Sequence, residues 1–115
     1  MKILHLVLIA KWYDMQFSGV KTEEYRAINE YWCKRLFKWV CPGISRSTCT
    51  GYCYFVDGCY LSNIATPYTH VCFHRGYTNV TFLHKIDSIS VGYGRVEWGA
   101  PKGQRVIIIK HSQVL

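Results

Sequence analysis

The segment Ser18-Gly19-Val20-Lys21-Thr22-Glu23-Glu24-Tyr25-Arg26 places a glycine directly before a run of polar and charged residues. A glycine just past a helix commonly takes the left-handed conformation that ends the helix. The residues from Trp12 to Phe17 have apolar spacings compatible with a short amphipathic helix. We therefore predict a helix over residues 11–18, a turn at Gly19 and a strand over residues 21–27.

Successive side chains of a strand point to opposite faces, so Thr22, Glu24 and Arg26 are predicted to share one face, with Glu23 and Tyr25 on the other. Two interpretations of this strand stay open. In the first interpretation the strand forms a binding site, because polar groups are costly to leave half-buried unless a ligand binds them. Alternatively, it is a solvated edge strand whose surface ion pair contributes about 0–1 kcal/mol.

The chain has 115 residues, half of them hydrophobic and 16% aromatic. This composition excludes a disordered tail and predicts one domain over residues 1–115 with a single core. The apolar run from Ile3 to Ala10 is too short to span a bilayer and is not followed by a signal-peptide cleavage site. We interpret it as a buried strand of a cytoplasmic protein with no membrane partner.

The net charge of +7 comes entirely from the chain beyond residue 30. Residues 1–30 carry four basic and four acidic groups, whereas residues 31–115 carry ten basic and three acidic groups. Such an excess favours a polyanionic partner such as nucleic acid. The basic residues are interleaved with rings that resemble a stacking surface for bases, namely Trp32, Trp39, Tyr77, Tyr93 and Trp98. For Trp32 and Trp39 we favour a place in the core.

Further strands are predicted over residues 3–8, 69–74, 80–91 and 104–110, the last deeply buried, with a weaker candidate over 52–56. Asn29 is a suitable N-cap for a second helix that runs to about Lys38. In the long strand, an unbroken alternation would place Ile89 on the opposite face from Phe82. Apolar residues on one face therefore predict a bulge near Asp87 and Ser88. The expected fold is α+β and mainly β: a small, curled β-barrel of five to six strands with two short helices.

Six cysteines, at positions 33, 41, 49, 53, 59 and 72, allow three interpretations. A disulfide framework fits the even count, but we expect a reducing compartment. A zinc site is the second interpretation, although the sequence lacks the usual paired C-x-x-C spacing. Its weak candidates are Cys41, Cys49, Cys53 and Cys59, with Cys72 or His74 able to complete the set. Buried thiols are the default, so no cofactor is predicted. His5 is expected to be a hydrogen-bonded core residue, and His84 to face solvent or a cleft.

Several elements of the sequence resemble the ASCH domain family, in particular its small branch from phages and bacteria. They are the Lys-Trp-Tyr-Asp-Met element at 11–15, the segment at 18–26, Tyr-Trp-Cys-Lys-Arg-Leu at 31–36, Arg-Gly-Tyr-Thr at 75–78 and Gly-Arg-Val-Glu-Trp-Gly-Ala-Pro at 94–101. The resemblance covers about residues 3–40 and 70–111, and it leaves a Cys-rich insertion at about 41–68 unrecognised. It implies a PUA-like β-barrel with a cleft beside the first helix, used chiefly to bind RNA.

The resemblance also implies a possible activity, because some members hydrolyse an acetylated cytidine nucleoside. Those members have a lysine after the glycine turn, a threonine three positions on and a glutamate from a later strand. Lys21 matches the lysine, but Glu24 stands where the threonine is expected, and Thr22 is one strand step away. Glu97 is the candidate for the later glutamate.

Three functions therefore stay open. In the first, RNA or a nucleotide is bound by residues drawn from Lys21, Thr22, Glu24, Arg26, Arg75, Tyr77 and Trp98, with the rings stacking on bases. In the second, an amidohydrolase acts on N4-acetylcytidine-like nucleosides, with Glu24 or Glu97 as general base and Lys21 stabilising the oxyanion. In the third, the Cys-rich segment binds a protein partner or a metal.

Overall fold

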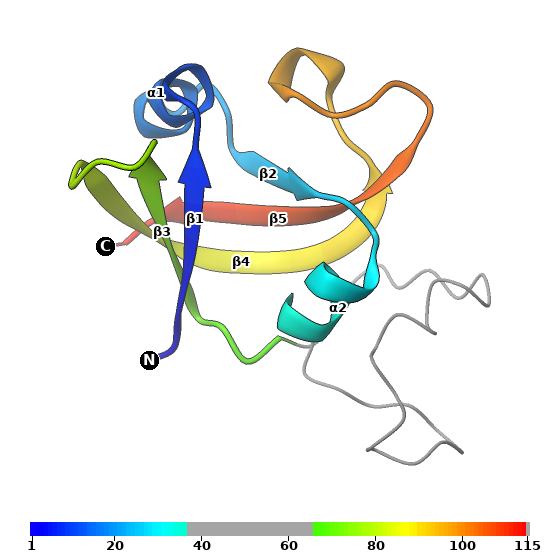
Figure 1. Ribbon diagram of the computed structural model, residues 1–115, viewed down its shortest axis with the longest axis horizontal. Helices are drawn as coiled ribbons and strands as arrows, with labels where there is room; N and C mark the ends of the chain where they lie inside the picture. Colours follow the sequence, from blue (N-terminus) through cyan, green and yellow to red (C-terminus); the bar gives the residue numbers. More distant parts are fainter. Residues whose placement is uncertain (37–65, 115) are drawn as a thin grey trace.

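The computed structural model describes residues 1–36 and 66–114, in which five strands form one curled sheet accompanied by two short helices (Figure 1). This confirms the predicted mainly β fold. The elements are β1 (Ile3–Leu8), α1 (Ala10–Ser18), β2 (Glu23–Arg26), α2 (Glu30–Leu36), β3 (His70–Arg75), β4 (Thr81–Tyr93), the 3-10 turn η1 (Val96–Trp98) and β5 (Arg105–Gln113).

Several predictions fall outside the described residues and are not addressed by the structure. They concern the strand over 52–56, the Cys-rich insertion, Trp39 and the weak metal candidates Cys41, Cys49, Cys53 and Cys59. None of the helices in the described ranges is long and apolar enough to cross a membrane.

The strand order is β1-β3-β4-β5-β2, so that β1 and β2 are the two edges of the sheet. β1 runs parallel to β3, and the other neighbours are antiparallel. β4 is the long curved strand of Figure 1, and it pairs with both β3 and β5. Its register shifts between Ile86 and Ser88, which confirms the bulge predicted from the broken apolar phase.

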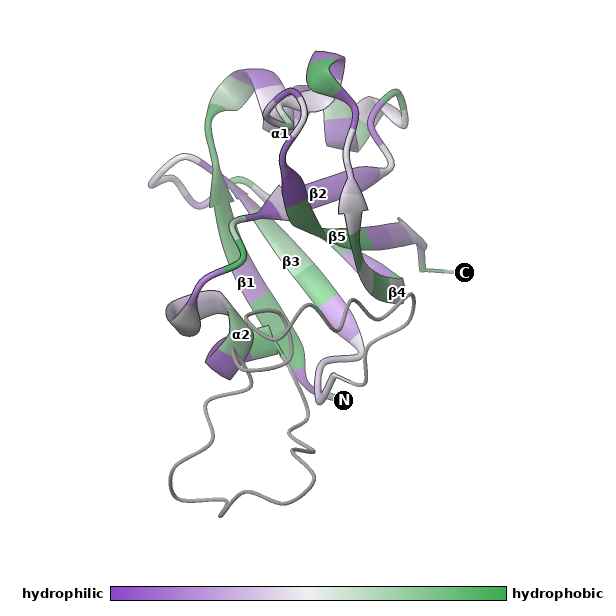
Figure 2. Cartoon of the chain, turned by 90° about the vertical axis from the view of Figure 1, so that its right-hand side faces the viewer, coloured by the Kyte–Doolittle hydropathy of each residue, from purple (hydrophilic) through white to green (hydrophobic). Residues whose placement is uncertain are grey.

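The main core is formed by alternate residues of the strands, among them Leu4 and Leu6 of β1 and Phe73 of β3. Figure 2 shows hydrophobic and hydrophilic residues interspersed along the strands. β5 is buried on both faces. Ile107 and Ile109 point into the main core, whereas Ile108 joins a smaller cluster with Tyr25, Ala100 and Val106. His5 lies between two inward leucines, on the exposed face of β1, so the prediction of a core histidine is wrong.

Gly19 ends α1 in the left-handed conformation, with φ of 85°, as the sequence predicts. Its N–H donates to the carbonyl of Gln16 at 3.2 Å, and the N–H of Lys21 donates to the carbonyl of Met15 at 3.0 Å. The predicted cap of α2 is also present, because Asn29 Oδ1 accepts from the N–H of Trp32 at 2.9 Å. α1 therefore connects the two edges of the sheet through a tightly bonded turn.

Gly94 directly follows β4 and lies against the smaller core cluster, so a substitution there tests how tightly that cluster is packed. A Cβ added there would lie 2.6 Å from Tyr25 Cε1 and 2.7 Å from Ala100 Cβ. We expect Gly94→Ala to lower the free energy of unfolding by about 1–3 kcal/mol, because extra volume in a packed core forces neighbours to move. Urea denaturation measures this change.

Gly92→Ala is the matched control, since its added Cβ would meet only Ile108 Cδ1, at an ordinary contact distance of 3.5 Å. It is expected to leave stability unchanged or to raise it by up to about 1 kcal/mol. Equal losses in the two variants would show that crowding at Tyr25 is not the cause.

Candidate functional site

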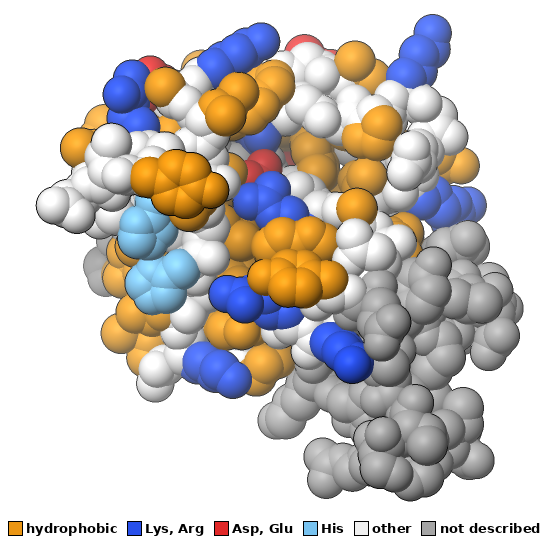
Figure 3. Space-filling view, viewed as in Figure 1, with side chains coloured by type: hydrophobic (Ala, Val, Ile, Leu, Met, Phe, Trp, Pro, Cys, Tyr) orange, Lys and Arg blue, Asp and Glu red, His pale blue; other side chains and the backbone are white. Residues whose placement is uncertain are grey.

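A cavity of about 250 Å³ lies beside α1, between β2 and the end of β1. We call it the α1 cavity. Its lining comes from four segments of the chain: Val7, Leu8 and Ile9; Trp12; Lys21, Glu24, Tyr25 and Arg26; and Trp98 and Gly99. On the face seen in Figure 3, basic and hydrophobic side chains adjoin and acidic ones are few.

A buried charge cluster occupies one wall of this cavity. The side chains of Lys21 and Glu24 are 2% and 4% exposed, and Lys21 Nζ donates to Glu24 Oε1 at 3.0 Å. Arg26 donates from its NH1 group to the other oxygen, Glu24 Oε2, at 3.1 Å. The backbone N–H of Tyr25 also donates to Glu24 Oε1. Both carboxylate oxygens of Glu24 therefore have partners, which contradicts the alternative of a solvated surface ion pair.

Aromatic rings surround the two cations of this cluster. Lys21 Nζ lies 4.7 Å from the centroid of the Trp12 ring and 5.5 Å from that of Tyr25. Arg26 Cζ lies 5.1 Å from the Trp32 ring centroid. Burial lowers the pKa of Lys21, and the neighbouring Glu24 opposes that shift. The lysine is thus held in a weakly hydrated site where cation–π contacts gain strength.

Tyr25 joins β2 to the loop that follows β4. Its hydroxyl donates to Glu23 Oε1 at 2.8 Å and accepts from the N–H of Arg95 at 3.0 Å. Burial raises the pKa of Tyr25 to about 12, so the hydroxyl stays protonated at neutral pH. This bridge holds the segment that carries Trp98 against the cavity.

A second, larger hollow of about 550 Å³ adjoins the first and is named here the α2 hollow. Val7 of β1 and Arg26 of β2 line both spaces, so the two spaces adjoin. The other lining residues come from β1, from α2 and from the turn after β3, and they are His5, Leu6, Tyr31, Trp32, Arg35 and Tyr77. The Tyr77 side chain is almost fully exposed, at 99%.

Five of the predicted site residues lie at this composite site. Lys21, Glu24, Arg26 and Trp98 line the α1 cavity, and Tyr77 lines the α2 hollow. A cavity therefore lies beside the first helix, where the cleft was predicted, and Lys21, Glu24 and Arg26 meet in its wall.

Three other predicted residues do not line either space. Thr22 is exposed, because β2 begins at Glu23 and the strand alternation does not extend to it. Arg75 pairs with Asp14 at 3.1 Å. The Glu97 side chain is 63% exposed and lies 3.5 Å from Arg95. Thr22, Arg75 and Glu97 are thus absent from the cavity wall.

Sequence reasoning missed Trp12 and Arg35 as lining residues. Trp12 belongs to the Lys-Trp-Tyr-Asp-Met element, but its helical spacing suggested only a core contact. Arg35 is four residues after Tyr31, a spacing that places both on one face of α2. Its guanidinium lies 5.9 Å from the Tyr31 ring centroid, and that pairing is the signal that could have identified it.

Comparisons with known proteins leave the function to be argued from this site. No family model matches the sequence, and no curated protein or solved structure matches it significantly. The resemblance to the ASCH family therefore depends on the sequence elements alone.

The Lys21–Glu24 pair generates a stability prediction. Glu24→Gln leaves a buried lysine without its counter-charge, and we expect the free energy of unfolding to fall by about 3–5 kcal/mol. Because the folded-state pKa of Lys21 is lowered from 10.5, the unfolded chain binds more protons between that lowered pKa and pH 10.5. Stability of this variant should therefore rise with pH as the folded-state lysine loses its proton. Denaturation at several pH values measures both effects.

The double variant Lys21→Met, Glu24→Gln is the control, since it removes the charge that would be left unpaired. It should be more stable than Glu24→Gln alone, and its stability should no longer rise with pH through the titration of Lys21. An identical loss in the single and double variants would show that the unpaired lysine charge is not the cause of the loss.

Proposed function

We propose that the protein is an ASCH-type module that binds RNA or a free nucleotide in the α1 cavity and along the α2 hollow. The observation that carries this proposal is the position of Arg26. Its guanidinium borders both spaces and stacks on Trp32. Its Nε is buried and has no hydrogen-bond partner within residues 1–36 and 66–114. A buried donor of this kind is normally satisfied, and a small rotation of the Arg26 side chain would bring it to a phosphate or base acceptor in either space.

The size of the α1 cavity supports a small aromatic ligand. Its volume of about 250 Å³ is slightly below the ~300–1,000 Å³ of sites for drug-sized ligands, which suits a single base or nucleoside. The walls offer indole rings from Trp12 and Trp98 and a polar corner at Arg26. Rings for stacking with a few fixed polar groups are typical of sites for unpaired bases.

The α2 hollow supports contacts with a continuing strand. It combines two guanidinium groups, Arg26 and Arg35, with the rings of Tyr31, Trp32 and Tyr77. Basic groups that follow a backbone, with aromatic side chains beside them, are the usual composition of single-stranded nucleic acid sites. The net charge of +7 favours the same partner. The proposal also places the protein in the cytoplasm, where the thiol of Cys72 would remain reduced.

Arg26→Gln tests the binding function. Fluorescence anisotropy with labelled single-stranded RNA, repeated at several salt concentrations, should show tight binding at low salt. The logarithm of affinity should fall linearly with the logarithm of salt concentration, by about 0.7 for each phosphate contact. We expect Arg26→Gln to weaken binding and to reduce that slope by about one contact.

Arg75→Gln is the matched control, because Arg75 is also an ion-paired arginine but lies outside both spaces. It should keep the affinity and salt dependence of the native chain. Binding that responds equally to both substitutions would reflect net charge alone and would contradict a site at Arg26.

An amidohydrolase is the second candidate function, and one distance favours it. Lys21 Nζ and Glu24 Oε1 are 3.0 Å apart within one cavity, so a cation and a carboxylate are available to a substrate there. Hydrolysis of N4-acetylcytidine adds water across the amide, releasing acetate and returning a proton to the cytidine amine. Glu24 would accept the proton of water, and Lys21 would stabilise the oxyanion.

Incubation with N4-acetylcytidine, followed by chromatography for cytidine, measures this activity. If the enzyme function holds, Lys21→Met should abolish turnover while circular dichroism shows a folded chain. Glu97→Gln is the control and should retain turnover, because Glu97 does not line the cavity. No cytidine from the native chain would exclude this activity and leave the binding function in place.

A further inference from the structure

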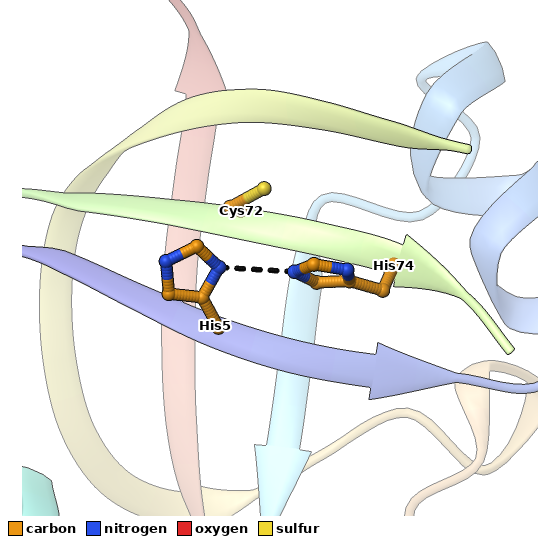
Figure 4. Close-up of side chains that lie close together, drawn as sticks. All are labelled: His5, Cys72 and His74. Carbon is orange, nitrogen blue, oxygen red and sulfur yellow. Dashed lines mark hydrogen bonds between the residues drawn. The ribbon is translucent and has the colours of Figure 1, made fainter. Parts of the chain in front are cut away.

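Three side chains that bind transition metals converge on the outer face of β1 and β3. The parallel register places His5 opposite Cys72, and His74 follows two residues later on the same face of β3. The intervening residues, such as Leu6 and Phe73, point into the core instead. Figure 4 shows His5 and His74 joined by a hydrogen bond, with Cys72 close by.

The distances within this cluster suit a shared ion. His5 Nδ1 and His74 Nε2 are 2.9 Å apart, and the potential ligand atoms of all three residues lie within 4.8 Å of one another. Tetrahedral zinc with Zn–N bonds of about 2.0–2.1 Å and Zn–S bonds of about 2.3 Å holds its donor atoms roughly 3.3–3.6 Å apart. Small side-chain rotations would therefore bring the three atoms to coordination distance.

We propose that His5, Cys72 and His74 form a Zn²⁺ site on the outer face of β1 and β3. Two imidazoles and a thiolate are donors that zinc prefers, whereas the hard cations Mg²⁺ and Ca²⁺ prefer oxygen. The ion takes the place of the hydrogen between the two imidazoles, which moves to the other nitrogen of the ring that donated it, and the Cys72 thiol releases its proton to solvent. Three protein ligands leave a fourth position for water or another oxygen donor.

The surroundings of the cluster affect the strength of the site. His5 is also a lining residue of the α2 hollow, where Arg26 and Arg35 contribute positive charge. These guanidinium groups oppose a cation, but the thiolate of Cys72 cancels one of its two charges. The metal site adjoins the proposed nucleic acid site through His5, but none of its three ligands belongs to the buried cluster around Glu24, so metal binding can be measured without RNA.

Titration of the full, reduced and metal-free chain with Co²⁺ tests this site, because cobalt reports both geometry and thiolate ligation in its absorption spectrum. We expect one equivalent with the intense visible bands of a tetrahedral ion and a thiolate charge-transfer band. Competition against a chromophoric chelator then gives the Zn²⁺ affinity. Each of His5→Ala, Cys72→Ser and His74→Ala should weaken binding by more than the roughly 10–100-fold lost when a residue that merely orients a ligand is removed.

His70→Ala is the matched control, since His70 lies on the same face of β3 but bonds to Thr69 Oγ1 at 2.7 Å and is not part of the cluster. It should keep the native affinity. His5 is exposed, so His5→Ala should preserve the fold, and circular dichroism checks this directly. Failure of the native chain to bind either ion, or unchanged affinity in His5→Ala, would overturn the proposal.

The other cysteines of the chain require a separate variant, because thiolates bind zinc wherever they cluster. In a chain with serine at positions 41, 49, 53 and 59, the cobalt spectrum and the zinc affinity should persist. Loss of binding in this variant, whatever the effect of His5→Ala, would show that the three residues do not form the site.

Discussion

The two edge strands of the sheet, β1 and β2, are consecutive in the chain and are joined by one short helix. The nine residues of α1 rise about 13–14 Å, and the turn after it folds back onto Met15 and Gln16. Five strands laid flat would span about 19 Å from first to last. This connection favours a curled sheet in which both edges approach α1 (Figure 1). The α1 cavity and the α2 hollow both take lining residues from β1 and from β2. The position of the candidate site therefore follows from the short helical connection between these two strands.

Local signals were sufficient to predict most of the fold. The apolar run of β1 and the isoleucines of β5 identify buried strands, Gly19 ends α1, and the phase change around Asp87 marks the bulge. The order of the strands was not predictable, because neither the parallel pairing of β1 with β3 nor the separation of β1 from β2 leaves a local pattern. The consecutive isoleucines predicted the deep burial of β5, but the residues that cover Ile108 are distant in sequence and were not predictable.

The charged wall of the candidate site was predictable because it lies within one segment, whereas Trp98 and Tyr77 were selected only as rings suited to stacking. Lys21, Glu24 and Arg26 were identified because they share a turn and a strand, and the structure brings them together. Glu97 was selected as the only available carboxylate of its kind, and sequence could not reveal that its turn directs it outward. The cluster around His5 was missed for a related reason, since it forms only through strand register between residues far apart in the chain.

The gap between β1 and β2 also has a thermodynamic consequence. A molecule bound in the gap would contact both edges of the sheet and act as a brace against its flattening. Any ligand that binds the folded chain alone raises the free energy of unfolding, by about 2.7 kcal/mol at 100 times its dissociation constant. The melting temperature of the chain should therefore rise when the gap is occupied, whatever the chemical nature of the occupant.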